Sequence, residues 1–223
     1  MKEKLYLKKD GYEINYGVYA PESYEGLPLI VYLHGAGERG ENYSHLTRHA
    51  IPMLIAEGRE YPAVVLCPQC PAEFVWDNIV TTVKSIIDKV AEEYSVDKSR
   101  ICITGSSMGG FGTWSMGLTY PNFFSAIAPI AGGGMAWRAD NLRTTPVYAY
   151  HGALDTAVLP ELSKMMVEKV NQTGGRAELE ILENYGHNDG INEVYRRGEV
   201  IDKLLGERRT TKEIIKEHLS HMF

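Results

Sequence analysis

Short apolar runs alternate with helical segments along most of the chain, and this alternation constrains the fold more than any other feature. Most of the runs are continuously apolar, which is typical of strands buried on both faces of a sheet: residues 29–33, 63–66, 101–104, 124–130 and 146–150. Helices are expected between them, over 45–58, 78–94, 108 to the residue before Pro121, 159–172 and 191–205. Strands that alternate with helices predict an α/β fold, with a mostly parallel central sheet and helices on both faces.

The flanks of this pattern predict edge strands and a terminal helix. Residues 4–20 alternate apolar and polar side chains and turn at Asp10-Gly11, which indicates an antiparallel pair. Residues 177–182 alternate as an outer strand. A chain of 223 residues without repeats or a low-complexity linker is expected to form a single domain, 1–223. Residues 212–223 predict an extra helix that either packs on this domain or mediates a homodimer.

Charge and hydropathy exclude several classes of partner. The formal net charge is -6 and no basic stretch dominates, so we expect no nucleic acid and no anionic membrane as a partner. No apolar run reaches the roughly 18 residues that a membrane helix needs. The first ten residues carry lysines but no apolar segment follows them, so we predict no signal peptide and a cytoplasmic protein.

The cysteines do not predict a disulfide framework or a metal site. Only three are present. Cys67 and Cys70 have CxxC spacing, but zinc would need two more ligands nearby, and a redox motif would need a helix that starts at Cys67. Cys67 instead ends a strand-like run, and Cys102 lies within another. We therefore expect reduced, structural cysteines.

One strand end carries the pentapeptide Gly105-Ser106-Ser107-Met108-Gly109. The apolar run before it and the glycine-rich helix start after it provide the strand–turn–helix context of a nucleophile elbow. In such an elbow the serine has a strained backbone, and the flanking glycines avoid collisions across the turn. Gly109, Gly110 and Gly112 each weaken a helix by about 1 kcal/mol relative to alanine, which indicates a helix very close to the sheet. Ser107 is the candidate nucleophile.

A serine nucleophile needs a base, and the base needs an acid to orient it. His187 is the candidate base, because it follows the last strand in a loop over residues 184–189. Asp155 follows the penultimate strand and is the candidate acid; it could also cap a helix. Asp189 is the rival acid, but it is too near His187 in sequence to reach behind its ring easily.

The other histidines fit the role of base less well. His34 and His151 precede glycines at strand ends, which suits structural packing of the turn. The remaining four fall on expected helices, where we expect solvated or capping side chains: His45, His49, His218 and His221.

The oxyanion of an acyl-transfer reaction needs two backbone N–H groups. We expect one from Met108, at the N-terminus of the helix after Ser107, where the helix dipole helps. The other is expected from the loop His34-Gly35-Ala36-Gly37, at Ala36. No side chain in that loop is needed for this role.

The chain order serine, aspartate, histidine is that of the α/β-hydrolases. Over residues 28–205 the sequence resembles small α/β-hydrolase esterases. The shared elements are His34–Gly40, Gly105–Gly110, His151-Gly152 with Asp155, and Gly186-His187. The resembling group includes dienelactone-hydrolase-like, carboxylesterase/phospholipase-like, and feruloyl or polyhydroxybutyrate-depolymerase-like proteins. Dienelactone hydrolases carry cysteine where Ser107 stands. The resemblance implies ester hydrolysis through an acyl-serine, with no metal and no organic cofactor.

The substrate is less constrained than the reaction. Only residues 131–145 separate the strand 124–130 from the next, so no large lid is expected. Four loop residues are candidates for the pocket wall: Trp76, Met135, Trp137 and Tyr185. An open, aromatic cleft favours short acyl or arylacyl esters, including acetyl or feruloyl esters of plant-derived saccharides. Two alternatives stay open: a prolyl-oligopeptidase-like peptidase, and a non-catalytic binding protein of this fold.

Overall fold

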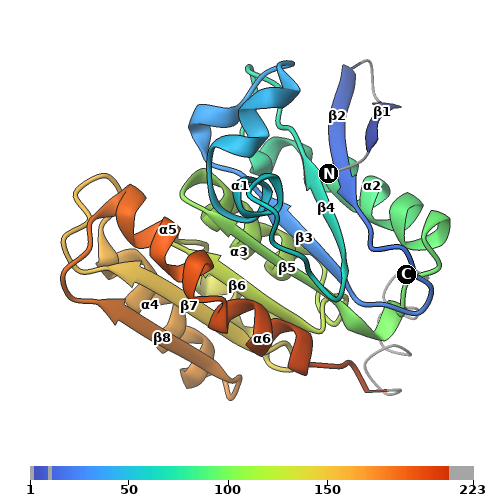
Figure 1. The fold of residues 1–223 in the computed structure, drawn as a ribbon. Helices are drawn as coiled ribbons and strands as arrows, with labels where there is room; N and C mark the ends of the chain where they lie inside the picture. The colour runs from blue at the N-terminus through green and yellow to red at the C-terminus, as the bar shows by residue number, and fades with distance from the viewer. Residues whose placement is uncertain (1–2, 10–11, 211–223) are drawn as a thin grey trace.

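Eight strands form one sheet in the part of the chain that this computed structural model describes, residues 3–9 and 12–210 (Figure 1). The strand order is β1-β2-β4-β3-β5-β6-β7-β8. The strands are β1 (Glu3–Lys9), β2 (Tyr12–Tyr19), β3 (Leu29–Leu33), β4 (Val64–Pro68), β5 (Ile101–Ser106), β6 (Ala126–Ile130), β7 (Val147–Gly152) and β8 (Ala177–Leu182). β2 pairs antiparallel with β1 and β4, and all other neighbours are parallel. The predicted mostly parallel sheet is confirmed.

Helices cover both faces of the sheet (Figure 1). One face carries α1 (Ala50–Ala56), α5 (His187–Arg197) and α6 (Glu199–Gly206). The other carries α2 (Val80–Glu93), α3 (Met108–Thr119) and α4 (Pro160–Gln172). Short 3-10 helices lie in the connections: η1 (Ala36–Glu38), η2 (Tyr43–Arg48), η3 (Trp76–Ile79), η4 (Lys98–Arg100) and η5 (Ala136–Leu142). No helix in these ranges is both long enough and apolar enough to cross a membrane.

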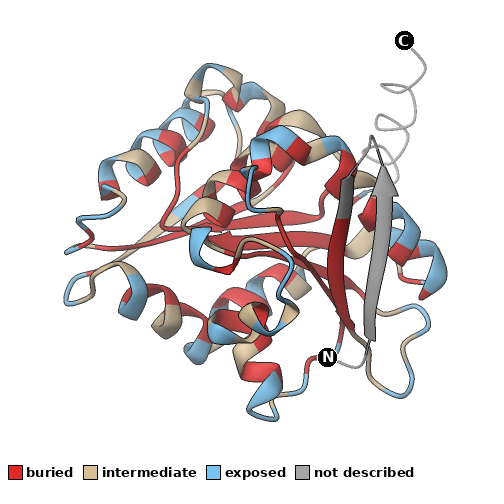
Figure 2. Cartoon of the chain, turned by 90° about the horizontal axis from the view of Figure 1, so that it is seen from above, coloured by how far each residue is buried: buried red, intermediate tan, exposed pale blue. Residues whose placement is uncertain are grey.

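The core has two parts because successive side chains of a strand point to opposite faces. On β3, Leu29, Val31 and Leu33 pack with the layer of α2, α3 and α4. Ile30 and Tyr32 pack with the layer of α1, α5 and α6. Figure 2 shows buried strands between two helical layers whose outer surfaces are exposed. Burial on both faces explains why the central strands are continuously apolar.

Two expected helices are interrupted. The expectation of one continuous helix over 45–58 is wrong. The segment forms two helices: η2 ends at Arg48, and α1 begins at Ala50, which has a φ of +51°. Pro52 lies in the first turn of α1, where its missing N–H has no intrahelical acceptor to lose. The helix expected over 191–205 is two helices, α5 and α6, which meet at Gly198 with a φ of +84°.

The connections at the carboxyl edge also differ in detail from the sequence-based expectation. His187 is the first residue of α5, and not part of a loop over 184–189. The segment between β6 and β7 contains η5 and, as expected, no lid domain within the described chain. The helix expected over 212–223, and any dimer contact made by it, lies outside the described residues.

Candidate active site

The candidate site lies at the carboxyl ends of the parallel strands. Ser107 follows β5, Asp155 follows β7, and His187 follows β8 at the start of α5. Ala36 follows β3 at the start of η1. Because parallel strands end at one edge of the sheet, residues more than 100 positions apart in sequence lie side by side there.

Ser107 occupies the strained turn that the sequence predicts. Its φ is +57° and its ψ is -120°, a conformation that L-residues rarely adopt and that costs about 1–3 kcal/mol. The turn is fixed from both sides: the Ser107 N–H donates to the Ile130 carbonyl over 3.0 Å, and Phe111 N–H donates to the Ser107 carbonyl over 3.1 Å. The side chain of Ser107 is thereby held above the sheet edge.

The glycines after Ser107 let α3 approach the sheet closely. A β-carbon at Gly109 would overlap the carbonyl oxygen of Leu33, and one at Gly110 would overlap that of Ile130. The first turn of α3 therefore lies against the ends of β3 and β6. This close approach explains a helix start that intrinsic propensity disfavours.

Ser107, His187 and Asp155 form a continuous hydrogen-bonded series. Ser107 Oγ is 2.9 Å from His187 Nε2, and His187 Nδ1 is 2.6 Å from Asp155 Oδ2. An ionised carboxylate only accepts hydrogen bonds, so Nδ1 of the neutral imidazole carries the proton and Nε2 accepts from the serine hydroxyl. This arrangement can move the hydroxyl proton of Ser107 to His187.

Asp155 is held in its ionised form by the groups around it. Burial acts to raise its pKa, but the Val158 N–H, the His187 imidazole and the Ala157 N–H outweigh burial and hold the pKa below its ordinary value. Oδ1 accepts from both N–H groups at 2.9 Å, which leaves Oδ2 for His187. Asp155 thus bonds to its own loop as well as to the base, while the rival Asp189 accepts from Gly186 N–H.

The imidazole of His151 contacts the Asp155 carboxylate in addition to the groups above. Its Nε2 is 2.8 Å from the Val158 carbonyl and 3.3 Å from Asp155 Oδ2. Its Nδ1 is 2.8 Å from Ser163 Oγ. Burial lowers the pKa of this imidazole. The predicted packing role of His151 therefore includes a contact with the candidate acid.

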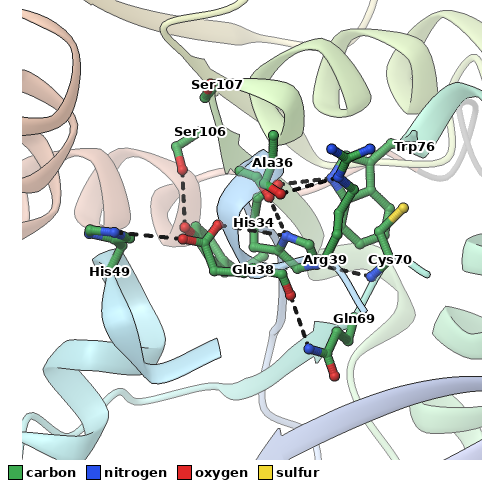
Figure 3. A network of polar contacts seen from close by, with 12 residues as sticks. His34, Ala36, Glu38, Arg39, His49, Gln69, Cys70, Trp76, Ser106 and Ser107 are labelled. Carbon is green, nitrogen blue, oxygen red and sulfur yellow. Dashed lines mark hydrogen bonds and ion pairs between the residues drawn. The ribbon is translucent and has the colours of Figure 1, made fainter. Parts of the chain in front are cut away.

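Hydrogen bonds to Cys70, Trp76 and Arg39 hold the loop after β3 in place (Figure 3). His34 Nε2 accepts from Cys70 N–H at 2.9 Å, and the His34 carbonyl accepts from Trp76 Nε1 at 2.9 Å. Arg39 Nε donates to the Ala36 carbonyl at 3.1 Å. These bonds fix the backbone of Ala36 beside Ser107. Met108 is the first residue of α3, where N–H groups have no intrahelical acceptor.

A cavity of about 300 Å³ opens beside Ser107. Its walls come from the loop after β3, the end of β5 and the start of α5: Gly35, Ala36, Gly37, Glu38, His49, Ser106, Ser107, His187, Asn188 and Ile191. Glu38 and His49 were not predicted as site residues. Glu38 could have been identified from the sequence, because it is a charged residue directly after the glycine-rich turn at a strand end.

The four predicted wall residues lie elsewhere than this cavity wall. The expectation for Trp76 is wrong, because its side chain is 1% exposed and packs in the core against Gly112 and the His34 ring. Met135 and Trp137 are exposed at η5, Trp137 by 71%. Tyr185 is half-buried against the layer of α5. The aromatic or apolar character of these side chains does not by itself show whether they line the cavity beside Ser107.

The structural role expected for the cysteines agrees with their surroundings. Cys67, Cys70 and Cys102 are free and buried, and burial raises the pKa of Cys70 and Cys102 to about 12. Such thiols are poor nucleophiles and metal ligands. Across residues 3–9 and 12–210, no group of three or more His, Cys, Asp or Glu side chains could hold a metal ion.

Sequence comparison relates the chain to known esterases. The phospholipase/carboxylesterase family matches residues 64–204. The chain is 30% identical over 156 residues to a bifunctional acetylxylan esterase/xylanase of Neocallimastix patriciarum, covering 67% of this chain and 22% of that protein. It therefore spans less than a quarter of the length of this relative.

Solved structures resemble the chain over nearly its whole length. A thermostable esterase aligns with a TM-score of 0.81 and 28% identity, over 93% of this chain and 63% of that one. A feruloyl esterase module from Clostridium thermocellum, in complex with sinapinate, aligns with a TM-score of 0.70 over 92% of this chain and 87% of that one. At 17% identity the second likeness supports the fold alone. By its fold, its sequence match and its strand-end serine, this chain belongs to the phospholipase/carboxylesterase family of α/β-hydrolases.

Proposed function

We propose that the protein is a serine esterase that forms an acyl-Ser107 intermediate. Ser107 Oγ attacks the ester carbonyl carbon while His187 Nε2 takes the hydroxyl proton. The N–H groups of Met108 and Ala36 stabilise the oxyanion. His187 then protonates the leaving alcohol as the C–O bond breaks, and later takes a proton from the water that hydrolyses the acyl-enzyme.

The observation that carries this proposal is the series from Ser107 through His187 to Asp155, with gaps of 2.9 and 2.6 Å. It is built on a strained backbone turn at Ser107, of the kind found at functional sites. Membership of the phospholipase/carboxylesterase family supports the same reaction.

The proposed substrates are short acyl or arylacyl esters, including acetyl and feruloyl esters of plant-derived saccharides. Similarity to an acetylxylan esterase/xylanase supports an acetyl group on a saccharide. The short connection between β6 and β7 supports an uncovered site that accepts a bulky alcohol.

Covalent labelling tests the reaction directly. A fluorophosphonate probe is expected to label the wild-type protein once and to leave Ser107→Ala unlabelled. Ser107→Ala should also lose about 10³-fold or more of the hydrolysis rate on p-nitrophenyl acetate. Ser23→Ala, which changes an exposed serine in the loop between β2 and β3, is the matched control and should behave as wild type. A Ser107→Ala protein with full activity contradicts the proposal.

A panel of acetate, butyrate, octanoate and feruloyl esters tests the substrate class in the same assay. Acetate and feruloyl esters are expected to have the highest kcat/KM. A clear optimum at octanoate would contradict the short-acyl and arylacyl assignment and leave the acyl-serine mechanism standing.

A further inference from the structure

Glu38 places a buried carboxylate on the wall of the cavity beside Ser107 (Figure 3). The residue is 5% exposed. Within the described residues, the contacts of the two carboxylate oxygens are with imidazoles and not hydrogen bonds. The nearest cationic candidates are two imidazoles, with His49 Nε2 at 3.6 Å and His34 Nδ1 at 3.8 Å. Burial makes hydrogen bonds to a carboxylate worth more than in water, so a donor that enters the cavity beside Glu38 would be bound there.

His34 cannot serve as that partner. Its Nε2 accepts from the Cys70 N–H, and its Nδ1, 2.6 Å from the Gly35 carbonyl, must donate there. Both ring nitrogens are thus committed to the backbone. Burial also lowers the pKa of His34 to about 4, which keeps the ring neutral at physiological pH. His34 therefore lies near the Glu38 carboxylate but has no N–H left to donate to it.

The carboxylate is also not what holds the loop in place. The Glu38 carbonyl accepts from Gln69 Nε2 at 2.9 Å, and Arg39 bonds to the carbonyls of Ala36, Ala72 and Phe74. Backbone atoms therefore fix the loop, and the Glu38 side chain is left facing the cavity.

The position of Glu38 relates it to the reacting centre. A β-carbon at Gly35 would lie 3.2 Å from Glu38 Oε2 and 3.7 Å from Ser107 Cβ, so the carboxylate and the serine lie on either side of this glycine. His187 and Asn188 form the wall on the side of α5. Because His187 must protonate the leaving alcohol, the alcohol part of an ester lies on the side of this cavity.

The lining favours hydroxyl groups over other donors. Glu38 accepts hydrogen bonds, while His49 and Asn188 can donate or accept, and Ile191 is the apolar member of the opposite wall. A hydroxyl both donates and accepts, so a polyhydroxy alcohol matches this mixed lining. His49, with a side chain 44% exposed, stands at the rim where such an alcohol would extend outward.

We propose that Glu38 is a specificity-determining residue that accepts hydrogen bonds from hydroxyl groups on the alcohol part of the substrate, so that the enzyme prefers esters of polyhydroxy alcohols such as saccharides. This inference rests on the proposed esterase function. It assigns a side-chain role to a loop that the reaction itself uses only through its backbone.

Three acetate esters that differ only in the alcohol test the assignment: glycerol monoacetate, ethyl acetate and acetylcholine. Glu38→Gln is expected to lower kcat/KM about ten-fold on glycerol monoacetate, since it replaces charge-assisted hydrogen bonds by neutral ones. On ethyl acetate the change should stay within about two-fold. Glu41→Gln, the same substitution at an exposed position of the same loop, is the matched control and should leave both values unchanged.

A binding measurement on inactive protein tests the role of Glu38 independently of ester hydrolysis. Calorimetric titration of xylotriose into Ser107→Ala, and into Ser107→Ala with Glu38→Gln, should show about ten-fold weaker binding to the double variant. If no ester is cleaved and no probe labels Ser107, the esterase proposal fails, yet this titration still decides the role of Glu38.

Three results would overturn the inference. An equal loss on glycerol monoacetate and ethyl acetate would show that Glu38 only supports the loop. A loss greatest on acetylcholine, which has no hydroxyl, would indicate a cation site. Equal affinity of the two Ser107→Ala proteins for xylotriose would show that the carboxylate does not contact the alcohol.

Discussion

Three imidazoles at the carboxyl edge of the sheet have different chemistry because their neighbours differ. His187 contacts a serine hydroxyl and an ionised carboxylate. His34 is enclosed by backbone groups of its own loop and of Cys70. His151 lies between Asp155, Val158 and Ser163. His151 also contacts a serine, but Ser163 is buried and its hydroxyl donates to the Gly132 carbonyl. Ser107, the serine that His187 contacts, lines the cavity instead.

The protonation of His34 gives a pH-dependent stability. Burial lowers its pKa from 6.5 to about 4, so between these values the unfolded chain binds a proton more readily than the folded chain. This part of the stability is complete above pH 6.5 and is lost as the pH falls towards 4. The slope approaches about 1.4 kcal/mol per pH unit. His34→Gln is expected to flatten the dependence of unfolding free energy on pH, measured by urea unfolding from pH 4.5 to 7.5.

The exposed His49 provides the comparison for this measurement. A wild-type slope in His49→Gln would assign the flattening to His34 and not to the loss of an imidazole in general. Equal slopes for wild type and His34→Gln would contradict the assignment to His34.

Among elements, α3 is the one whose sequence conflicts most with its structure. Three glycines in its first five residues weaken it as an isolated helix. The conflict disappears at the sheet, because the carbonyls of Leu33 and Ile130 leave no room for a β-carbon at Gly109 or Gly110. The helix that positions Ser107 is therefore stabilised by docking and not by propensity.

Gly109→Ala is expected to displace α3 from the sheet. Its new methyl group would overlap the backbone of Leu33, which cannot move aside as a side chain could, so we expect a loss of about 3 kcal/mol in unfolding free energy. Thermal unfolding should show a Tm lower by at least about 6 °C, with esterase activity abolished.

Gly117→Ala in the same helix is the matched control. The nearest atoms to its β-carbon would be the side-chain tips of Ile127 and Leu142 at 3.0 Å, which can adjust, while alanine favours the helix. Its Tm is expected to change much less than that of Gly109→Ala. Equal losses for the two variants would contradict a specific role for the contact between α3 and Leu33.

At the scale of the whole molecule, α5 connects the candidate base to the centre of the sheet. Tyr195 Oη is 2.9 Å from Thr104 Oγ1, which itself donates to the Ala128 carbonyl, so the tyrosine is the donor of the pair. The Tyr195 ring packs edge-on against Tyr32 at 5.6 Å. Arg59 donates to the carbonyls of Tyr195 and Arg196 at the end of the helix. These contacts fix the helix that begins with His187.

Tyr195→Phe is expected to lower the unfolding free energy by about 1 kcal/mol, since it removes one buried hydrogen bond while keeping the ring contact. For a chain of this size the Tm should fall by about 2–4 °C in differential scanning calorimetry. An unchanged Tm would show that the hydroxyl contributes nothing to the docking of α5. Tyr24→Phe, at a ring that is half-buried on the other face, is a suitable comparison.

The sequence by itself determined the strand–helix alternation and the strand ends at which Ser107, Asp155 and His187 stand. Local patterns suffice for this, because a strand buried on both faces must be apolar and a nucleophile turn must be flanked by glycine. The tertiary structure decided what depends on distant neighbours. It set the break in front of Ala50, the burial of Trp76, and the direction of the Glu38 carboxylate towards the cavity. No local pattern encodes the side of the loop to which a side chain turns, because packing of the whole edge of the sheet determines it.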